Sequence, residues 1–207
     1  MDIIKHYFPQ MTELQEQQFA ALGVLYKEWN EKINVISRKD IDNLYEHHVL
    51  HSLAISKILR FKADTSILDV GTGGGFPGIP LAIMHPDCHL TMIDGIGKKI
   101  KVAQEVARSI GLQNVEIKQL RAEDEKGKYD FVVSRAVMPL KDFVKLVRSR
   151  VQQGGFNALP NGIICLKGGE LQGEIQPYKN IAELYEVSNF FKEEYFKTKK
   201  AVYLPIR

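Results

Sequence analysis

Residues 67–78 read Ile67-Leu68-Asp69-Val70-Gly71-Thr72-Gly73-Gly74-Gly75-Phe76-Pro77-Gly78. A short apolar run that leads into a glycine-rich turn indicates a buried strand, a loop and then a helix. Glycine permits positive φ angles and lets the backbone approach a ligand without a Cβ in the way. Because open α/β sheets bind ligands where their strands end, this loop predicts a nucleotide-type site.

On both sides of this loop, short apolar runs alternate with helical patterns, which is typical of a parallel sheet. We expect strands at residues 67–70, 90–93, 115–117, 131–133, 163–166, 183–187 and 201–205, and helices at 78–85, 98–110 and 140–151. The last two strands fit a terminal antiparallel hairpin. The predicted fold is α/β, with a mostly parallel seven-stranded sheet and a C-terminal antiparallel strand.

The first third of the chain is expected to be helical. A capping box opens a helix predicted over residues 12–30, and a broad apolar stripe predicts a second helix over 40–60. The chain has no Pro-, Gly- or Ser-rich linker after them. We therefore expect residues 1–64 to be an N-terminal helical extension packed on a domain of residues 65–207, in one compact unit.

Composition narrows the class of protein. The chain has 207 residues, of which 44% are hydrophobic and 26% charged, so disordered and disulfide-scaffold classes are excluded. Its two isolated cysteines predict neither a disulfide nor a zinc site, and its apolar runs are too short to span a membrane. We expect a cytoplasmic protein without a metal. The net charge of +3 permits a polyanionic partner, and no protein partner is implied.

A carboxylate at the end of the second strand, Asp94, can accept hydrogen bonds from both hydroxyls of a ribose. Residues 73–78 also satisfy the GxGxxG pattern of dinucleotide-binding proteins, which is weak evidence alone. Phe76 and Pro77 would crowd a pyrophosphate at the start of the helix. The longer Asp-x-Gly-x-Gly-x-Gly run resembles motif I of class I S-adenosylmethionine-dependent methyltransferases. We therefore favour S-adenosylmethionine over a nicotinamide dinucleotide as the cofactor.

Further segments resemble one family, the small bacterial methyltransferases known as RsmG or GidB. The matching segments are Trp29-Asn30-x-x-x-Asn34, the run from Leu68 to Leu81, Asp94-Gly95-Ile96-Gly97-Lys98-Lys99, Ser134-Arg135-Ala136 and Leu166-Lys167-Gly168-Gly169. The resemblance covers nearly the whole chain. It implies the class I methyltransferase (Rossmann-like) fold and methyl transfer from S-adenosyl-L-methionine to N7 of a guanine in the 530 loop of 16S ribosomal RNA, in the small subunit or its precursor.

The resemblance also implies residue roles. It assigns Gly71, Gly73, Gly75, Phe76, Asp94, Ala122, Glu123 and Arg135 to the cofactor. It implies RNA contacts for Lys98, Lys99 and Lys167, and Arg38, which lies between the two N-terminal helices, is a further candidate. The chain departs from the family at His51, because the family pattern His-x-x-Asp-Ser carries an acid there, and the role of that position is open.

The expected chemistry needs no proton transfer. Guanine N7 carries an in-plane lone pair and no proton, so its attack on a sulfonium methyl group needs no general base. We therefore nominate no catalytic acid or base and expect catalysis by orientation. Two other functions stay open: methylation of a small molecule or protein, and cofactor-sensing RNA binding without turnover.

Overall fold

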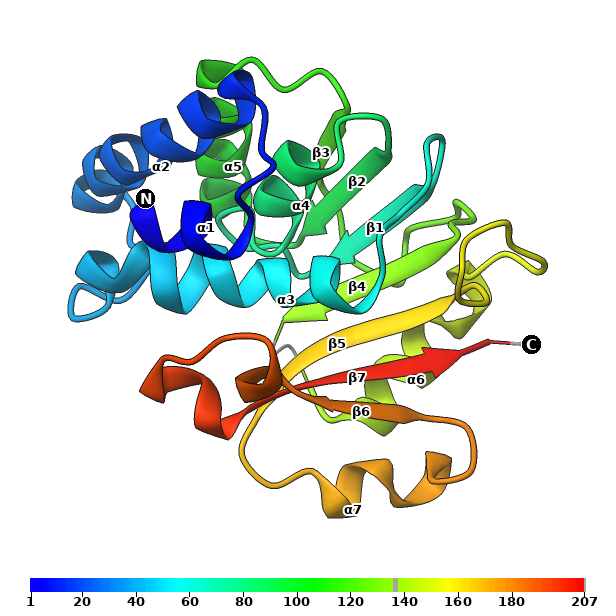
Figure 1. Cartoon of the computed structure of the whole chain (residues 1–207). Coiled ribbons are helices and arrows are strands. Elements are labelled where there is room, and N and C mark those ends of the chain that lie inside the picture. Colours follow the sequence, from blue (N-terminus) through cyan, green and yellow to red (C-terminus); the bar gives the residue numbers. More distant parts are fainter. Residues whose placement is uncertain (136–137, 207) are drawn as a thin grey trace.

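The computed structural model describes residues 1–135 and 138–206. Seven strands form one sheet in the order β3-β2-β1-β4-β5-β7-β6 (Figure 1). They are β1 (Ser66–Val70), β2 (His89–Asp94), β3 (Val115–Gln119), β4 (Phe131–Arg135), β5 (Gly162–Gly168), β6 (Glu183–Glu186) and β7 (Lys199–Pro205). This is the class I methyltransferase fold, so the predicted fold class is confirmed.

Strand direction determines where the functional end of the sheet lies. Strands β1 to β5 pair in parallel, whereas β7 pairs antiparallel with both β5 and β6. The predicted terminal hairpin is therefore confirmed. Since β1, β2 and β4 run in the same direction, their carboxyl ends, at Val70, Asp94 and Arg135, meet at one edge of the sheet.

Helices cover both faces of the sheet. They are α1 (Asp2–Tyr7), α2 (Glu13–Lys32), α3 (His51–Ile58), α4 (Gly78–Met84), α5 (Gly97–Ser109), α6 (Leu140–Val147) and α7 (Gln172–Ile175). Alternation along each strand sends side chains to opposite faces. Ile67 of β1 therefore packs in the cluster of α2 to α5, and its neighbour Leu68 packs in the cluster of α6. No helix of the described residues is long and apolar enough to cross a membrane.

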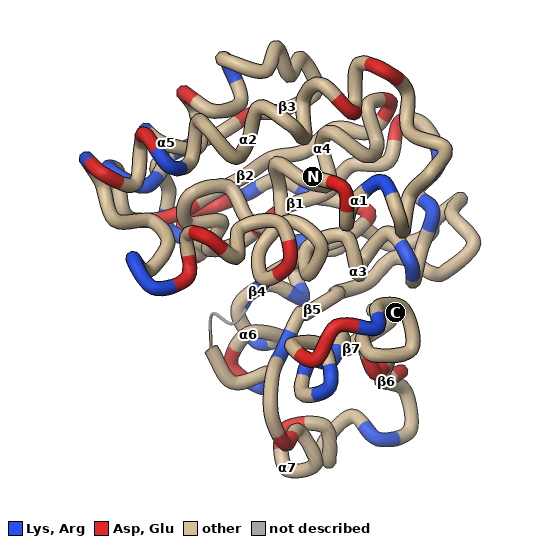
Figure 2. The backbone as a smooth tube through the Cα atoms, turned by 60° about the vertical axis from the view of Figure 1, so that its left-hand side comes forward, with Lys and Arg blue, Asp and Glu red and all other residues tan. Residues whose placement is uncertain are grey.

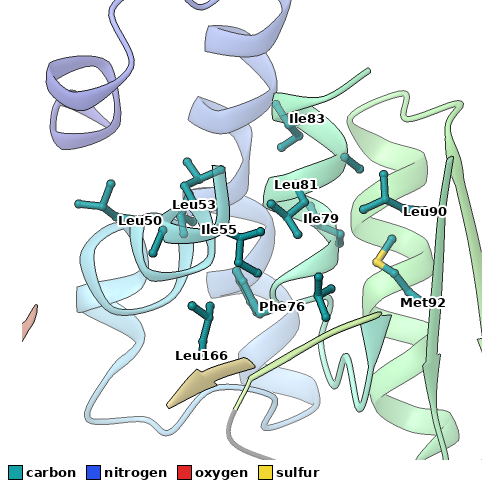
Figure 3. Packing of buried hydrophobic residues seen from close by; sticks show 14 of the residues in the cluster. Leu50, Leu53, Ile55, Phe76, Ile79, Leu81, Ile83, Leu90, Met92 and Leu166 are labelled. Carbon is teal, nitrogen blue, oxygen red and sulfur yellow. The ribbon is translucent and has the colours of Figure 1, made fainter. Parts of the chain in front are cut away.

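The larger of these clusters joins the N-terminal helices to the glycine-rich loop. Figure 3 shows side chains of α3, α4 and β2 directed into one cluster, with Phe76 of the loop among them. Phe19 and Leu22 of α2 are fully buried in the same cluster. The apolar stripes of the N-terminal helices therefore pack on the same helices that follow β1 and β2.

The expected helix over 40–60 is present, but it is not a single α-helix. Residues Ile41–Asn43 form a 3-10 turn and Leu44–Leu50 a π-helix before α3 begins. The prediction was wrong in this detail because an apolar stripe does not distinguish i+4 from i+5 hydrogen bonding. The expected helix over 140–151 likewise ends as α6 at Val147, and a 3-10 turn follows.

Candidate active site

The glycine-rich loop between β1 and α4 has an open side and a packed side. Gly73 has φ +56°, and a Cβ there would meet only the Lys99 Cδ atom, at 3.9 Å. Gly75 has φ +109°, and a Cβ there would lie 2.4 Å from Ile79 Cδ1. The backbone at Gly73 is thus free to approach a ligand, whereas Gly75 lets the loop pack closely on α4.

Two buried side chains, Asp69 and Tyr26, form hydrogen bonds with the backbone of this loop. Asp69 Oδ2 accepts a hydrogen bond of 2.8 Å from the Gly78 amide, and the Tyr26 hydroxyl donates one of 2.7 Å to the Gly74 carbonyl. Burial raises the pKa of Asp69 to about 7. Its carboxyl is fully buried, and its Oδ1 has no partner among the described residues. Asp69 therefore supports the loop and does not reach a ligand on its open side.

Asp94 lies at the end of β2, directly beside the open side of the loop. Its Oδ2 accepts from the Gly73 amide at 2.9 Å, and its Oδ1 accepts from the Ile96 amide at 2.8 Å. Each carboxylate oxygen has a further lone pair, so the half-buried carboxylate can also accept from two hydroxyls of a ligand.

The loop after β3 also reaches this position. The Leu120 amide donates to the Asp94 carbonyl at 3.1 Å, which brings the following residues alongside β2. Ala122 is half-buried against the α6 cluster, and Glu123 is exposed. Both residues thus follow directly on the backbone contact between Leu120 and Asp94. Their contact with an adenine stays a prediction.

Arg135 lies at the end of β4, across the loop from Asp94. Its guanidinium lies over the Phe76 ring, 5.1 Å from the ring centroid. It donates to the His47 carbonyl at 3.3 Å and to His48 Nδ1 at 3.1 Å. The structure therefore brings Arg135 and Phe76 together, as expected for one site. Ala136, the last residue of the Ser-Arg-Ala motif, lies outside the described residues.

The four candidate RNA-contacting residues have different surroundings. Lys98 is exposed in the first turn of α5, Lys99 extends along Gly73, and Arg38 is exposed in the loop after α2. Lys167 Nζ instead donates to Glu174 Oε2 at 2.8 Å and to the Met138 carbonyl at 2.5 Å.

The Lys167 side chain is 10% exposed, so any RNA contact by it would require release of its ion pair. Lys98 and Lys99, in contrast, lie directly beside the site. Figure 2 shows basic and acidic residues interspersed over the molecule. Within the described residues, no group of three or more His, Cys, Asp or Glu side chains could hold a metal ion.

Sequence reasoning missed several residues that support the site from the N-terminal part. Asn30 accepts from the amides of Val35 and Ile36, both at 2.9 Å, and donates to the Ile36 carbonyl at 2.8 Å. This fixes the loop whose Val35 side chain packs on Gly74. The Trp-Asn motif contained the signal for Asn30, but Tyr26 had no recognisable pattern.

An S-adenosyl group fits these residues. The backbone is open at Gly73, the free lone pairs of Asp94 suit ribose hydroxyls, and Arg135 with Phe76 closes the opposite side. The sheet order and this site define a class I S-adenosylmethionine-dependent methyltransferase. An Aquifex aeolicus SAM-dependent methyltransferase shares the fold with a TM-score of 0.59 and 17% identity, covering 83% of this chain and 100% of that one.

Sequence comparison identifies the family within this class. The family model "GidB: rRNA small subunit methyltransferase G" matches residues 15–200. A protein named ribosomal RNA small subunit methyltransferase G from Phocaeicola vulgatus is 60% identical over 206 residues, covering 100% of this chain and 99% of that protein. The protein of that name from Flavobacterium johnsoniae is 52% identical over 207 residues, with 100% and 99% covered. The chain belongs to the rRNA small subunit methyltransferase G family.

Proposed function

We propose that this protein transfers a methyl group from S-adenosyl-L-methionine to N7 of a guanine in the 530 loop of 16S ribosomal RNA. The observation that carries the proposal is the family match over residues 15–200, which includes every residue of the site described above. The relatives that match over their full length are named as small-subunit rRNA methyltransferases.

The arrangement of the site suits a methyl transfer that needs no general base. When bound, S-adenosylmethionine supplies an electrophilic methyl group, and guanine N7 supplies a lone pair without a proton to remove. Asp94 holds the ribose hydroxyls, Gly73 admits the ligand to the backbone, and Arg135 with Phe76 lies on the far side. These residues bind and orient, and orientation can lower such a barrier by several kcal/mol.

We assign the RNA-facing side to the basic residues next to the glycine-rich loop. Lys98 and Lys99 begin α5 beside Gly73, and Arg38 lies in the loop that Asn30 holds against Gly74. Lys167 can join them after release of its ion pair. Guanine N7 lies in the deep, narrow groove of A-form RNA, so a base in a loop is accessible where a paired one is not. Ribosomal RNA in the small subunit or its precursor places the protein in the cytoplasm.

We also propose that residues 1–64 and 65–207 act as one compact unit. Residues of the first part, such as Phe19, are buried in the same cluster as Ile79 of α4. Tyr26 hydrogen-bonds the glycine-rich loop itself. The cofactor loop of the second part is therefore supported by side chains of the first.

The test is nucleoside mass spectrometry of 16S RNA. Small subunits that lack the modification are incubated with the protein and S-adenosylmethionine, with Asp94→Ala as the control. We expect 7-methylguanosine in the 530-loop fragment, and loss of that signal with the variant. Absence of the product, together with measurable S-adenosylhomocysteine binding, would overturn the RNA substrate and favour a small-molecule or protein methyltransferase or a non-catalytic sensor.

A further inference from the structure

The Asp40 carboxylate contacts two consecutive histidines of the π-helix, His47 and His48. Its Oδ1 lies 2.5 Å from His47 Nδ1, and its Oδ2 lies 2.6 Å from His48 Nε2. The hydrogen bonds from these imidazoles hold the pKa of the Asp40 carboxyl below its usual value, although burial acts in the opposite direction. Asp40 is therefore ionised at neutral pH and can only accept hydrogen bonds.

The other ring nitrogen of His48 faces Arg135. An arginine nitrogen only donates, so His48 Nδ1, 3.1 Å from the guanidinium, is the acceptor and carries no proton. The proton of the neutral ring is therefore on Nε2, which donates to Asp40. Burial and the nearby Arg135 charge lower the pKa of His48 to about 4, which agrees with a neutral ring.

These contacts hold the guanidinium without neutralising it. Its acceptors are a neutral imidazole and the His47 carbonyl, and Phe76 packs against its face. Among the described residues no carboxylate forms an ion pair with Arg135, so its charge is not directly paired before a ligand binds. A carboxylate in the place of His48 would instead have paired with this charge.

We propose that Asp40 and His48 are positioning residues for Arg135. Asp40 fixes the tautomer of His48, and His48 Nδ1 fixes the guanidinium in the orientation that binds the cofactor. We call these contacts the Asp40–His48–Arg135 relay. The relay joins the loop before the π-helix to the end of β4, and His48 and Arg135 are 87 residues apart in the chain. The inference rests on the proposed function only in taking S-adenosylmethionine as the ligand of Arg135.

The Asp40 carboxylate determines the tautomer of His48, because it can only accept a hydrogen bond. In Asp40→Asn the side chain keeps its shape, but its amide can donate to His48 Nε2 and so move the ring proton to Nδ1. Nδ1–H would then face the N–H groups of Arg135, donor against donor, and the guanidinium would turn away. The matched control is Asp42→Asn, which removes the same charge from an exposed residue two positions later.

The first measurement is the tautomer of His48 by long-range ¹H–¹⁵N NMR, together with S-adenosylhomocysteine affinity by calorimetry. We expect an Nε2–H ring at pH 7 in the unaltered protein and in Asp42→Asn. In Asp40→Asn we expect Nδ1–H and affinity reduced roughly tenfold, because hydrogen bonds to a charged group are at stake. An Nδ1–H ring in the unaltered protein, or unchanged affinity in Asp40→Asn, would overturn the relay.

A second measurement separates positioning from a merely structural role. His48→Asn keeps an acceptor near the Nδ1 position, whereas His48→Gln keeps a donor near the Nε2 position. We expect His48→Asn to retain more affinity for S-adenosylhomocysteine than His48→Gln. The reverse order would contradict action through Arg135.

The double variant completes the test. In an Arg135→Ala background, Asp40→Asn should change the affinity less than about twofold, since its route to the ligand is gone. A full loss in that background would assign Asp40 a structural role instead. None of these measurements uses RNA, so failure of the RNA substrate and failure of the relay give different results.

Discussion

The two arms of the site, Asp94 and Arg135, are built in different ways. The side chain of Asp94 accepts hydrogen bonds from amides of its own loop and of the neighbouring glycine-rich loop. Arg135 depends on His47 and His48, which lie 88 and 87 residues earlier in the chain. The direct hydrogen bonds of Asp94 therefore lie within the β1–β2 unit, whereas those of Arg135 form only when the N-terminal helices are packed on the sheet.

The largest effect should come from removing residues 1–64, because this deletes the partners of Arg135 and exposes much of the larger cluster. We expect the remaining fragment to lose cooperative unfolding, since Phe19, Leu22 and Tyr26 are fully buried against it. Thermal unfolding followed by near-UV circular dichroism measures this. A fragment that unfolds cooperatively and binds S-adenosylhomocysteine would show that the Asp94 arm folds and binds without the N-terminal helices.

Asp94→Ala should remove the other arm with little effect on folding. The variant loses the acceptor for the ribose hydroxyls and for the Gly73 amide, at a cost in S-adenosylhomocysteine binding of about 3 kcal/mol, roughly a hundredfold in affinity. Calorimetry measures the affinity, and urea unfolding serves as the control. The affinity of Asp94→Asn, which keeps one acceptor oxygen, should lie between those of Asp94→Ala and the unaltered protein. Equal binding by Asp94→Ala would exclude the carboxylate as the ribose ligand.

The same contrast explains what the sequence could predict. The buried strand, the glycine-rich turn and the acid that follows lie close together in the chain. Their pattern therefore predicted Asp94 and the sheet around it. The His48 contact with Arg135 is long-range, and an apolar stripe does not reveal that Leu44–Leu50 is a π-helix. Lys167 shows a second limit, because its partner Glu174 lies in a short helix with no clear sequence signal.

Two glycine variants separate packing from binding within the glycine-rich loop. Gly75→Ala places a Cβ 2.4 Å from Ile79 Cδ1 at φ +109°, and we expect a loss of about 2 kcal/mol in the free energy of unfolding. Gly73→Ala has open space at φ +56°, so we expect a smaller loss, about 1 kcal/mol. Urea unfolding measures both.

The loss of cofactor affinity should be larger for Gly73→Ala, although its expected loss of stability is smaller than that of Gly75→Ala. A methyl group at Gly73 enters the open side of the loop, where the ligand is expected, so S-adenosylhomocysteine affinity should fall more in Gly73→Ala than in folded Gly75→Ala. Calorimetry in conditions where both variants are folded provides the comparison. Equal affinity for Gly73→Ala and the unaltered protein would mean that the ligand does not approach the open side of the loop.

A variant of His51 tests the region next to Arg135, and its expected effect at pH 7 is as small as that of Gly73→Ala. Its ring is buried against Tyr195 and Phe196, and neither ring nitrogen has a partner among the described residues. Burial lowers the pKa of His51 well below 6.5, so the unfolded chain binds a proton that the folded chain does not. Stability is therefore lost as the pH falls below about 6.5.

His51→Leu removes both the unpaired nitrogens and this proton uptake. We expect the free energy of unfolding to rise by about 1 kcal/mol at pH 7, because burying an unpaired polar group is costly. The gain should grow by about 0.7 kcal/mol at pH 6, where the unfolded histidine takes up its proton. Urea unfolding at both pH values measures this, and His89→Gln, at a side chain that is 70% exposed, should change neither value. A loss of stability at pH 7 would mean that His51 makes polar contacts worth more than its burial costs, and that the Arg135 arm extends through this residue as well.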